Sequence, residues 1–203
     1  MINAGCGDIL VRRDIKWGIS NGFLAKPKFI VKTIKTIGTD YQNDKLKNYK
    51  EHVLNNKAMK DQILKDIQDA LSAGKSVLCL VDEVSHGEEL SKQLGIPFAQ
   101  GTDKKSGEYV EQLNAGTIAG LIGTAGKIGE GTDTKNVDVL IMAQFTASKG
   151  PVIQSVGRAL RTTTTKTEAI ILDYIPQGST MLTRHAMSRI DFYKEITTDV
   201  TII

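Results

Sequence analysis

Apolar residues gather into short uninterrupted runs in the second half of the chain. Val77-Leu78-Cys79-Leu80-Val81 is one such run, and the stretches 118–122 and 137–143 are similar. Continuous apolar runs of this length are typical of strands that are buried on both faces of a parallel sheet. We therefore predict strands at these three places, with further strands at 29–35, 97–99 and 168–173.

Between the strands, apolar positions recur at the three- and four-residue spacing of a helix. Met59 and Ile63 belong to one amphipathic helix, which Gly74 ends. Ser85 and Glu88 have the spacing of a capping box, which predicts that the next helix begins at Ser85. Helices are predicted at 41–54, 59–71, 85–94, 106–113, 151–161 and 180–194. This alternation predicts an α/β domain with a mostly parallel sheet and helices on both faces.

Residues 1–40 differ from the rest of the chain. Glycines separate short pieces such as 8–13, and the strand at 29–35 follows them. We interpret residues 1–40 as the linker or tail of a preceding domain together with a strand that leads into the next one. Residues 41–203 then form one domain, which is a usual size for a single core.

Composition limits the classes of protein that the chain can belong to. The formal net charge of +3 permits a polyanionic partner without demanding one. Cys6 and Cys79 are too far apart for a metal motif and too few for a disulfide framework. No apolar run approaches the roughly 18 residues of a membrane span. We expect a reduced, cytoplasmic protein, and the lysine-rich composition favours a bacterial or phage-infected cell as its source.

The stretch that carries most chemistry is Gln154-Ser155-Val156-Gly157-Arg158-Ala159-Leu160-Arg161. On a helix, residues three apart share a face, so Arg158 and Arg161 are predicted to project together, with Gln154 one turn back. Two guanidiniums on one face form a permanently charged clamp for phosphate oxygens. Gly157 leaves room for a group to approach. The plainer alternative is a solvated basic helix face.

A glycine-rich loop precedes this stretch, at Gly123 to Asp133, directly after the strand at 118–122. A loop at the carboxyl end of a parallel strand is where open α/β sheets bind ligands. Gly74-Lys75-Ser76 imitates the end of a phosphate-binding P-loop, but Asp69 stands where that motif needs glycine. It also ends a helix instead of opening one, so we do not interpret it as a phosphate site.

Taken in order, these pieces resemble the C-terminal RecA-like domain of superfamily 2 helicases and translocases. The similarity covers about residues 45–175 and is greatest to the RecG, XPB and phage UvsW type of DNA-remodelling enzyme. The segment 76–85 resembles motif IV of that family, 123–133 resembles motif V, and 154–161 matches motif VI, Q-x-x-G-R-x-x-R, in full. The resemblance implies a three-layer RecA-like fold and a role in ATP-driven movement along nucleic acid.

The resemblance also implies roles for individual residues. Arg158 and Arg161 look like arginine fingers that reach the ATP γ-phosphate from across an interdomain cleft, and Gln154 would orient that phosphate or its water. The implied nucleotide contacts are Gly131, Asp133 and Gly157. The implied contacts to a nucleic-acid strand are Thr124, Ala125, Gly126 and Ser85, with His86 as a further candidate. No residue of this chain is implied as a metal ligand.

The implied cofactors are ATP and Mg²⁺, both held mainly by an N-terminal RecA-like ATPase domain that these 203 residues do not contain. The implied partners are that domain and the backbone of DNA, or of RNA. We therefore expect that this chain alone neither hydrolyses ATP nor unwinds a duplex. Two other readings stay open: a stand-alone nucleic-acid-binding or regulatory module that has lost motor activity, and an unrelated α/β enzyme with a phosphate-containing ligand near Gly123.

Overall fold

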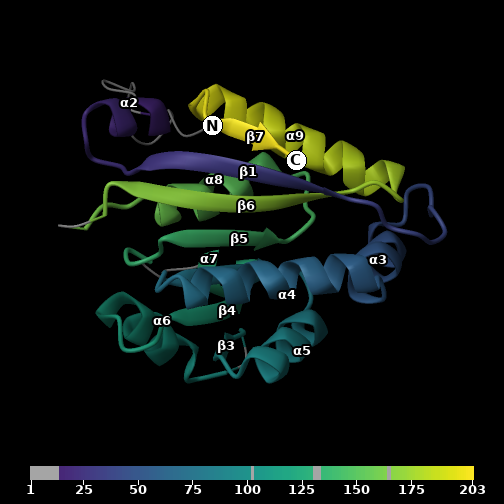
Figure 1. Ribbon diagram of the computed structural model, residues 1–203, viewed down its shortest axis with the longest axis horizontal. Coiled ribbons are helices and arrows are strands. Elements are labelled where there is room, and N and C mark those ends of the chain that lie inside the picture. The colour runs from purple at the N-terminus through teal and green to yellow at the C-terminus, as the bar shows by residue number, and fades with distance from the viewer. Residues whose placement is uncertain (1–13, 102, 130–133, 164–165) are drawn as a thin grey trace, which may run out of the picture.

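The computed structural model describes residues 14–101, 103–129, 134–163 and 166–203. Its centre is one seven-stranded sheet in the order β3-β4-β2-β5-β6-β1-β7, and every pair of neighbouring strands is parallel (Figure 1). The strands are β1 (Lys26–Ile34), β2 (Val77–Val81), β3 (Phe98–Ala99), β4 (Gly120–Thr124), β5 (Val139–Ala143), β6 (Glu168–Pro176) and β7 (Val200–Ile202). The predicted α/β class is confirmed.

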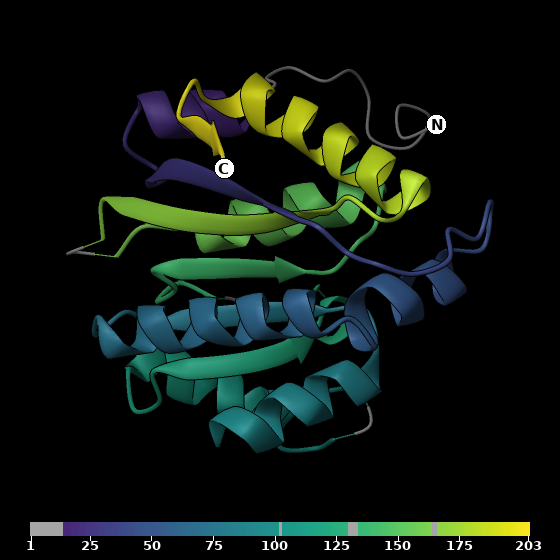
Figure 2. The ribbon, with the colours of Figure 1, turned by 45° about the vertical axis from the view of Figure 1, so that its right-hand side comes forward.

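Helices cover both faces of the sheet, which gives three layers (Figures 1 and 2). The helices are α2 (Ile15–Ser20), α3 (Lys45–Tyr49), a π-helical turn η1 (Lys50–Leu54), α4 (Lys57–Ser72), α5 (Val84–Leu94), α6 (Ser106–Ala115), α7 (Ala125–Gly129), α8 (Lys149–Ala159) and α9 (Thr180–Ile196). The first layer contains α3, η1, α4 and α5. The second contains α2, α6, α7, α8 and most of α9. None of the described helices is long and apolar enough to cross a membrane.

Two apolar clusters lie on either side of the sheet because side chains alternate between its faces. In β2, Leu78 belongs to the cluster under α8, whereas Cys79 belongs to the cluster under α4. Val156 of α8 and Ile63 of α4 are fully buried in these two clusters. The continuous apolar runs of β2 and β5 are thus explained, since every residue of both strands is buried.

The segment before residue 40 contributes to the same sheet. All nine residues of β1 pair with β6, from Lys26 opposite Glu168 to Ile34 opposite Pro176, and β1 also pairs with β7. Asp14 caps α2 by accepting a 2.8 Å hydrogen bond from the Trp17 backbone N–H. The predicted strand at 29–35 is therefore present. The division of the chain at residue 40 remains a prediction.

Three local predictions are wrong. The helix expected at 41–54 is a five-residue α-helix followed by a π-helical turn. The capping box does not form: α5 begins at Val84, Glu83 is its N-cap residue, and Ser85 is already helical. The helix expected at 151–161 ends at Ala159, because Leu160 accepts a 2.7 Å hydrogen bond from the Ala25 backbone N–H.

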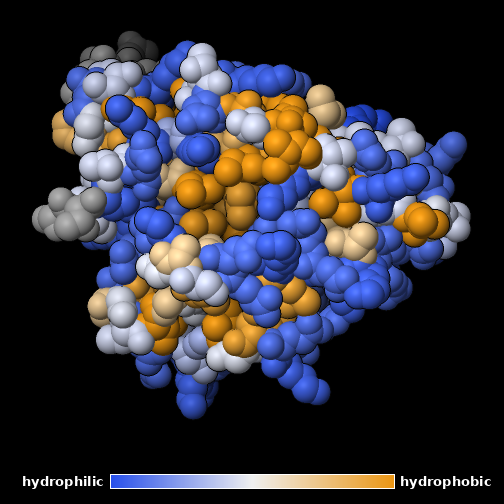
Figure 3. Space-filling view, viewed as in Figure 1, coloured by the Kyte–Doolittle hydropathy of each residue, from blue (hydrophilic) through white to orange (hydrophobic). Residues whose placement is uncertain are grey.

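The sheet is covered unevenly on the side of α4. Figure 3 shows an apolar area beside α4, over β1 and β6. Ile30, Ile34 and Ile170 are partly buried there and pack against the cluster under α4. Within this area Asp66 of α4 is almost fully buried and accepts hydrogen bonds from Lys32 at 2.6 Å and from the Tyr174 hydroxyl at 2.9 Å. These bonds attach α4 to β1 and β6.

Candidate functional site

The candidate site lies at the edge of the sheet where the parallel strands end. A pocket of about 270 Å³ opens there, beyond the carboxyl ends of β2, β4 and β5. This is the position at which open α/β sheets bind ligands. The lining residues are Asp82, Ala125, Gly126, Gln144, Thr146, Pro151 and Gln154. Three residues that the sequence singled out, Ala125, Gly126 and Gln154, are thus brought together from two separate motifs.

The wall formed by α7 depends on close packing behind it. Thr124 is the last residue of β4 and Ala125 begins α7, so the chain turns from strand to helix without a loop. A Cβ atom added to Gly123 would lie 2.4 Å from Ile128 Cγ1, which explains the glycine at the end of the strand. Gly126, by contrast, has no heavy atom within 4 Å of an added Cβ. A side chain at position 126 therefore has space at the pocket wall.

The opposite wall is the loop between β5 and α8, and Asp82 holds its first part. Asp82 Oδ2 accepts a 2.9 Å hydrogen bond from the Phe145 backbone N–H and lies 3.3 Å from the Lys45 ammonium group. Asp82 follows an apolar strand as a metal-binding acid often does, but its oxygen is used for this contact. Among the described residues no group of three His, Cys, Asp or Glu side chains could hold a metal ion.

Two residues of α9 hold the same loop from the other side. His185 Nδ1 donates to the Phe145 carbonyl at 3.0 Å, and Arg189 Nη1 donates to the Thr146 carbonyl at 2.9 Å. Arg189 is itself fixed by two 2.8 Å bonds to Asp173, and both side chains are 1% exposed. The Tyr193 hydroxyl donates a further 2.8 Å bond to Asp173. A buried ion pair in the core thereby positions one wall of the pocket.

Gln144 lies at the base of this loop and has an incompletely bonded amide. The residue is 1% exposed, and its Oε1 atom has no hydrogen-bond partner. Its Nε2 atom lies 3.7 Å from the sulfur of Met142, which is a weak acceptor. A buried polar atom without a hydrogen-bond partner destabilises the folded protein. The burial of the Gln144 amide therefore calls for a structural or functional explanation.

The residues of the arginine motif occupy three different environments. Gln154 is exposed on α8, and Pro151 lies in the first turn of that helix as expected. Arg158 is partly buried, and its Nη1 donates a 2.8 Å hydrogen bond to the Ile128 carbonyl of α7. Arg158 therefore links the arginine helix to the glycine-rich loop. Gly157 has only Ile15 Cδ1, at 3.9 Å, near an added Cβ, so this position is open.

Arg161 is not on the helix. It follows the end of α8, is exposed, and forms an isolated antiparallel bridge with Leu24. The expectation that Arg158 and Arg161 project from one helix face is therefore wrong. Backbone pairing holds the segment 160–161 against residues 24–25. In the sequence, Arg158 directly precedes the last residue of α8, Ala159, and Arg161 follows shortly after it.

The remaining predicted residues divide between accessible, buried and undescribed positions. Ser85 is exposed on α5 and stays a candidate. His86 is 1% exposed, and its Nδ1 lies 2.7 Å from the Tyr49 hydroxyl. Burial lowers the pKa of His86 to about 4, so the ring is neutral near pH 7. Because the side chain is buried, a phosphate in solution cannot reach it. Gly131 and Asp133 lie outside the described residues.

Several residues that line the pocket or hold its wall could not be picked out from the sequence. Gln144 and Thr146 stand in a loop without a motif, and His185 and Arg189 are ordinary positions of a predicted helix. The importance of His185 and Arg189 comes from contacts that join residues 16 to 43 positions apart. The sequence shows an acidic residue, Asp82, directly after the strand β2. It does not show that Asp82 accepts a hydrogen bond from the Phe145 N–H.

Parallel strands, helices on both faces and a pocket at the carboxyl edge define an open three-layer α/β domain. Three solved structures with this arrangement are similar to the chain. T4 UvsW matches with 16% identity and a TM-score of 0.64, over 88% of this chain and 41% of that one. LlaBIII, an ATP-dependent Type ISP restriction-modification enzyme bound to DNA, matches with 13% identity and a TM-score of 0.67, over 99% and 17%. S. cerevisiae Dbp5 bound to RNA and ADP BeF3 matches with 14% identity and a TM-score of 0.60, over 87% and 41%.

The chain thus spans less than half the length of each of these three proteins. Neither a protein-family model nor a curated protein matches the sequence. At these identities the structural similarity establishes the fold and not the activity. It confirms the RecA-like architecture that the sequence resemblance to superfamily 2 helicases implied, with the UvsW type among the matches.

Proposed function

We propose that this chain is the second motor domain of an ATP-dependent nucleic-acid helicase or translocase. The observation that carries the proposal is the pocket at the carboxyl edge of the sheet. It places Ala125 and Gly126 of one motif beside Gln154 of the other, and Arg158 links the two helices concerned. A pocket with helix-start N–H groups on one wall and a glutamine on the other suits a domain that contacts a sugar-phosphate chain and a nucleotide at neighbouring places.

The proposed nucleic-acid contacts are Thr124, Ala125, Gly126 and Ser85. The first backbone N–H groups of α7 have no acceptor inside the helix, because the helix has no preceding turn. Such groups, with short hydroxyl side chains, can bind strand phosphates without reading base sequence. We propose DNA as the natural strand, on the sequence resemblance to DNA-remodelling enzymes and on the similarity to LlaBIII, which is bound to DNA, although Dbp5 in the same comparison is bound to RNA.

The proposed nucleotide contacts are Arg158, Arg161 and Gln154, with Gly131, Asp133 and Gly157 close to the nucleotide. ATP would supply the phosphoryl group that is transferred to water. The permanent positive charges of Arg158 and Arg161 would stabilise the charge that develops on that group. We assign the binding of ATP and Mg²⁺ mainly to the N-terminal RecA-like domain, as the resemblance to superfamily 2 helicases implies.

In the proposed motor, the two domains close around ATP and open after hydrolysis, and the strand advances with each cycle. The proposed setting is the cytoplasm of a bacterial or phage-infected cell. The alternative is a stand-alone module that binds nucleic acid and has lost motor activity. An ATPase assay distinguishes the motor from the module. The motor should hydrolyse ATP when the chain is combined with an N-terminal ATPase domain, and the chain without that domain should not.

The strand contact is tested by adding a negative charge at the open pocket wall. Gly126→Glu should weaken binding of a single-stranded oligonucleotide by at least about tenfold, since about 1.4 kcal/mol of repulsion has that effect. The fold should persist, because an added Cβ at position 126 meets no other atom within 4 Å. Fluorescence anisotropy at fixed salt gives the Kd, and the melting temperature reports on folding.

Gly107→Glu is the matched control for that experiment. Gly107 is exposed on α6 and also has no atom within 4 Å of an added Cβ. It does not line the pocket. Equal loss of affinity in the two variants would place the strand elsewhere and contradict the proposed contact.

The chain without its partner domain should show no ATP hydrolysis above background. The reason is that arginine fingers act on a nucleotide that another domain holds. A phosphate-release assay with and without the oligonucleotide checks this. A clear rate that Arg158→Ala abolishes would show that the chain holds ATP by itself, and would overturn its assignment as the second domain.

A further inference from the structure

Phe23 presents an aromatic ring to solvent. Among the residues that the structure describes it is 62% exposed, whereas the other four phenylalanines are buried or partly buried. Its ring stacks on Trp17, with 5.2 Å between the ring centroids and 12° between the ring planes. One face of the ring therefore lies against Trp17, and the exposure of Phe23 leaves the other face to solvent. Phe23 belongs to neither apolar cluster of the core.

The turn that carries Phe23 is held firmly on α2. The backbone N–H groups of Phe23 and Leu24 both donate to the Gly18 carbonyl, at 2.9 Å and 3.1 Å. Gly22 has a φ of +74°, in the left-handed region that glycine adopts without strain. A Cβ atom added to Gly18 would lie 2.8 Å from Leu24 Cδ1, so Leu24 can approach α2 this closely because position 18 is glycine. The exposed ring thus has a fixed support.

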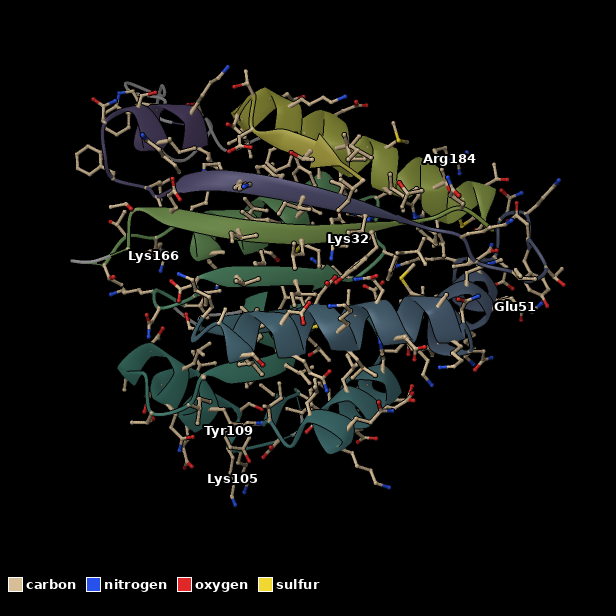
Figure 4. All side chains as sticks on the ribbon, in the orientation of Figure 1. Lys32, Glu51, Lys105, Tyr109, Lys166 and Arg184 are labelled. Carbon is tan, nitrogen blue, oxygen red and sulfur yellow. The ribbon has the colours of Figure 1, made fainter. Side chains whose placement is uncertain are left out.

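A hollow of about 420 Å³ adjoins this turn, at the edge of the sheet where β1 and β6 begin. Gly22 and Leu24, which flank Phe23 in the chain, both line it. The other lining residues are Ile19, Ala25, Lys26, Thr162, Thr163, Lys166 and Thr167. Figure 4 shows Lys166 at this end of the sheet, at the opposite side of the view from Arg184. Polar and cationic residues therefore stand directly beside the turn.

The charges around the turn favour an anionic ligand. Lys26 is exposed, and Arg161 is exposed and connected to the turn by its backbone bridge with Leu24. Two acids are also present: Asp14 caps α2, and Glu168 stands opposite Lys26 in the pairing of β1 with β6. Neither acid lines the hollow, and no other carboxylate among the described residues does. A ligand with a flat apolar group and a negative charge fits this surface.

We propose that Phe23, supported by Trp17, is a stacking platform for a nucleobase. Every nucleobase has a flat π face that stacks on an aromatic side chain without regard to sequence. Its phosphates are the anions that the neighbouring cations attract. The inference rests on the proposed function and adds a contact at the edge of the sheet opposite to the pocket beyond β2, β4 and β5. The base belongs either to the strand or to the nucleotide to which Arg161 is assigned.

The first measurement uses Trp17 as a reporter, because it is the single tryptophan of the chain. The whole chain is titrated with an oligothymidylate and, separately, with an abasic oligonucleotide of the same length. ATP and inorganic triphosphate form the second pair of ligands. A base that stacks on Phe23 should change the Trp17 emission, whereas the matching ligand without a base should not. The pair that shows this difference identifies the source of the base.

The second measurement compares two substitutions of the ring. Phe23→Leu keeps an apolar side chain but has no π face, so it should weaken binding of the ligand identified above by about tenfold, which is within the range for base stacking on an aromatic residue. Phe23→Tyr keeps the ring and should bind like the unmodified chain. Fluorescence anisotropy of labelled ligands at fixed salt gives the Kd, and the melting temperature reports on folding.

Ile37→Ala is the control for loss of an exposed apolar side chain. Ile37 is 83% exposed and lines neither the hollow nor the pocket. Its replacement should leave the Kd unchanged. Equal weakening by Phe23→Leu and Phe23→Tyr, or by Phe23→Leu and Ile37→Ala, would show that aromatic stacking is not the cause and would overturn the platform.

The outcomes separate this inference from the proposed function. If the unmodified chain binds neither ligand, both fail. If Gly126→Glu weakens strand binding while Phe23→Leu binds the strand and ATP as tightly as the unmodified chain, the platform is overturned and the proposed function stands. If Phe23→Leu weakens binding and Gly126→Glu does not, the platform stands and the strand contact at α7 is contradicted.

Discussion

In the assembled two-domain motor, Arg158→Ala should lower the rate of ATP hydrolysis by about 10³- to 10⁵-fold. The expected cause is loss of the positive charge that stabilises the transferring phosphoryl group. Nucleotide affinity should change far less, because the partner domain holds most of the nucleotide. Arg161→Ala should behave in the same way, although Arg161 lies beyond the end of α8. Steady-state turnover at saturating ATP, together with the Kd of a fluorescent nucleotide, measures both quantities.

Arg158 also has a structural contact, so the experiment needs a control for it. Its Nη1 donates to the Ile128 carbonyl, and the alanine variant loses this link between α8 and α7. Arg158→Lys keeps a positive charge but loses the planar fork of the guanidinium. Unchanged oligonucleotide binding in Arg158→Ala would show that α7 keeps its position. A variant with weakened nucleotide affinity and undiminished turnover at saturation would refute the arginine-finger assignment.

Arg189→Met should destabilise the chain by about 3–5 kcal/mol, since removing one partner of a buried ion pair leaves the other charge buried and unpaired. Among the described residues, the Tyr193 hydroxyl and the Tyr174 N–H would be the donors left to Asp173. The loop at Thr146 would also lose its anchor on α9. The free energy of unfolding from urea titration measures the change.

Replacing both partners separates the ion pair from the packing around it. In Arg189→Met/Asp173→Leu no unpaired charge remains, so the double variant should be more stable than Arg189→Met alone. Lys57→Ala, at the exposed pair with Asp61, should leave the stability of the chain unchanged. A loss of less than about 1 kcal/mol in Arg189→Met would show that water or other groups compensate the charge of Asp173.

The regular elements were predictable because their signal is local. The residues of β2 and β5 are buried on both faces, and a continuous apolar run is the direct consequence. The amphipathic pattern of α4 places Ile63 and Ile67 on its buried side. By contrast, β7 has only three residues, and nothing in so short a segment distinguishes a strand from a loop.

Features set by distant contacts were not predictable. The end of α8 and the position of Arg161 follow from pairing with residues 24–25, which lie more than a hundred positions earlier in the chain. The capping-box pattern predicted that the helix begins at Ser85. In the structure the turn after β2 places Glu83 at the N-cap position, so the helix begins earlier. The pocket walls that α9 and Asp82 hold likewise depend on long-range hydrogen bonds.

The candidate site was predictable in part. The motifs singled out Ala125, Gly126 and Gln154 separately, and the structure brings these three residues together around one pocket at the carboxyl edge. Motif spacing did not indicate Gln144, His185 or Arg189, because an amide, a histidine and an arginine in a loop or helix have many other uses. It also wrongly included His86, whose burial against Tyr49 depends on the packing of α3 on α5.

The most direct test of the account is a structure of the assembled motor with a nucleotide transition-state analogue and a single strand bound. We predict that the guanidiniums of Arg158 and Arg161 lie within hydrogen-bonding distance, about 2.7–3.2 Å, of the γ-phosphate mimic. The same structure should place a strand phosphate against the backbone amides of Ala125 and Gly126. A structure in which both arginines face solvent away from the nucleotide, or in which the strand avoids α7, would contradict the account.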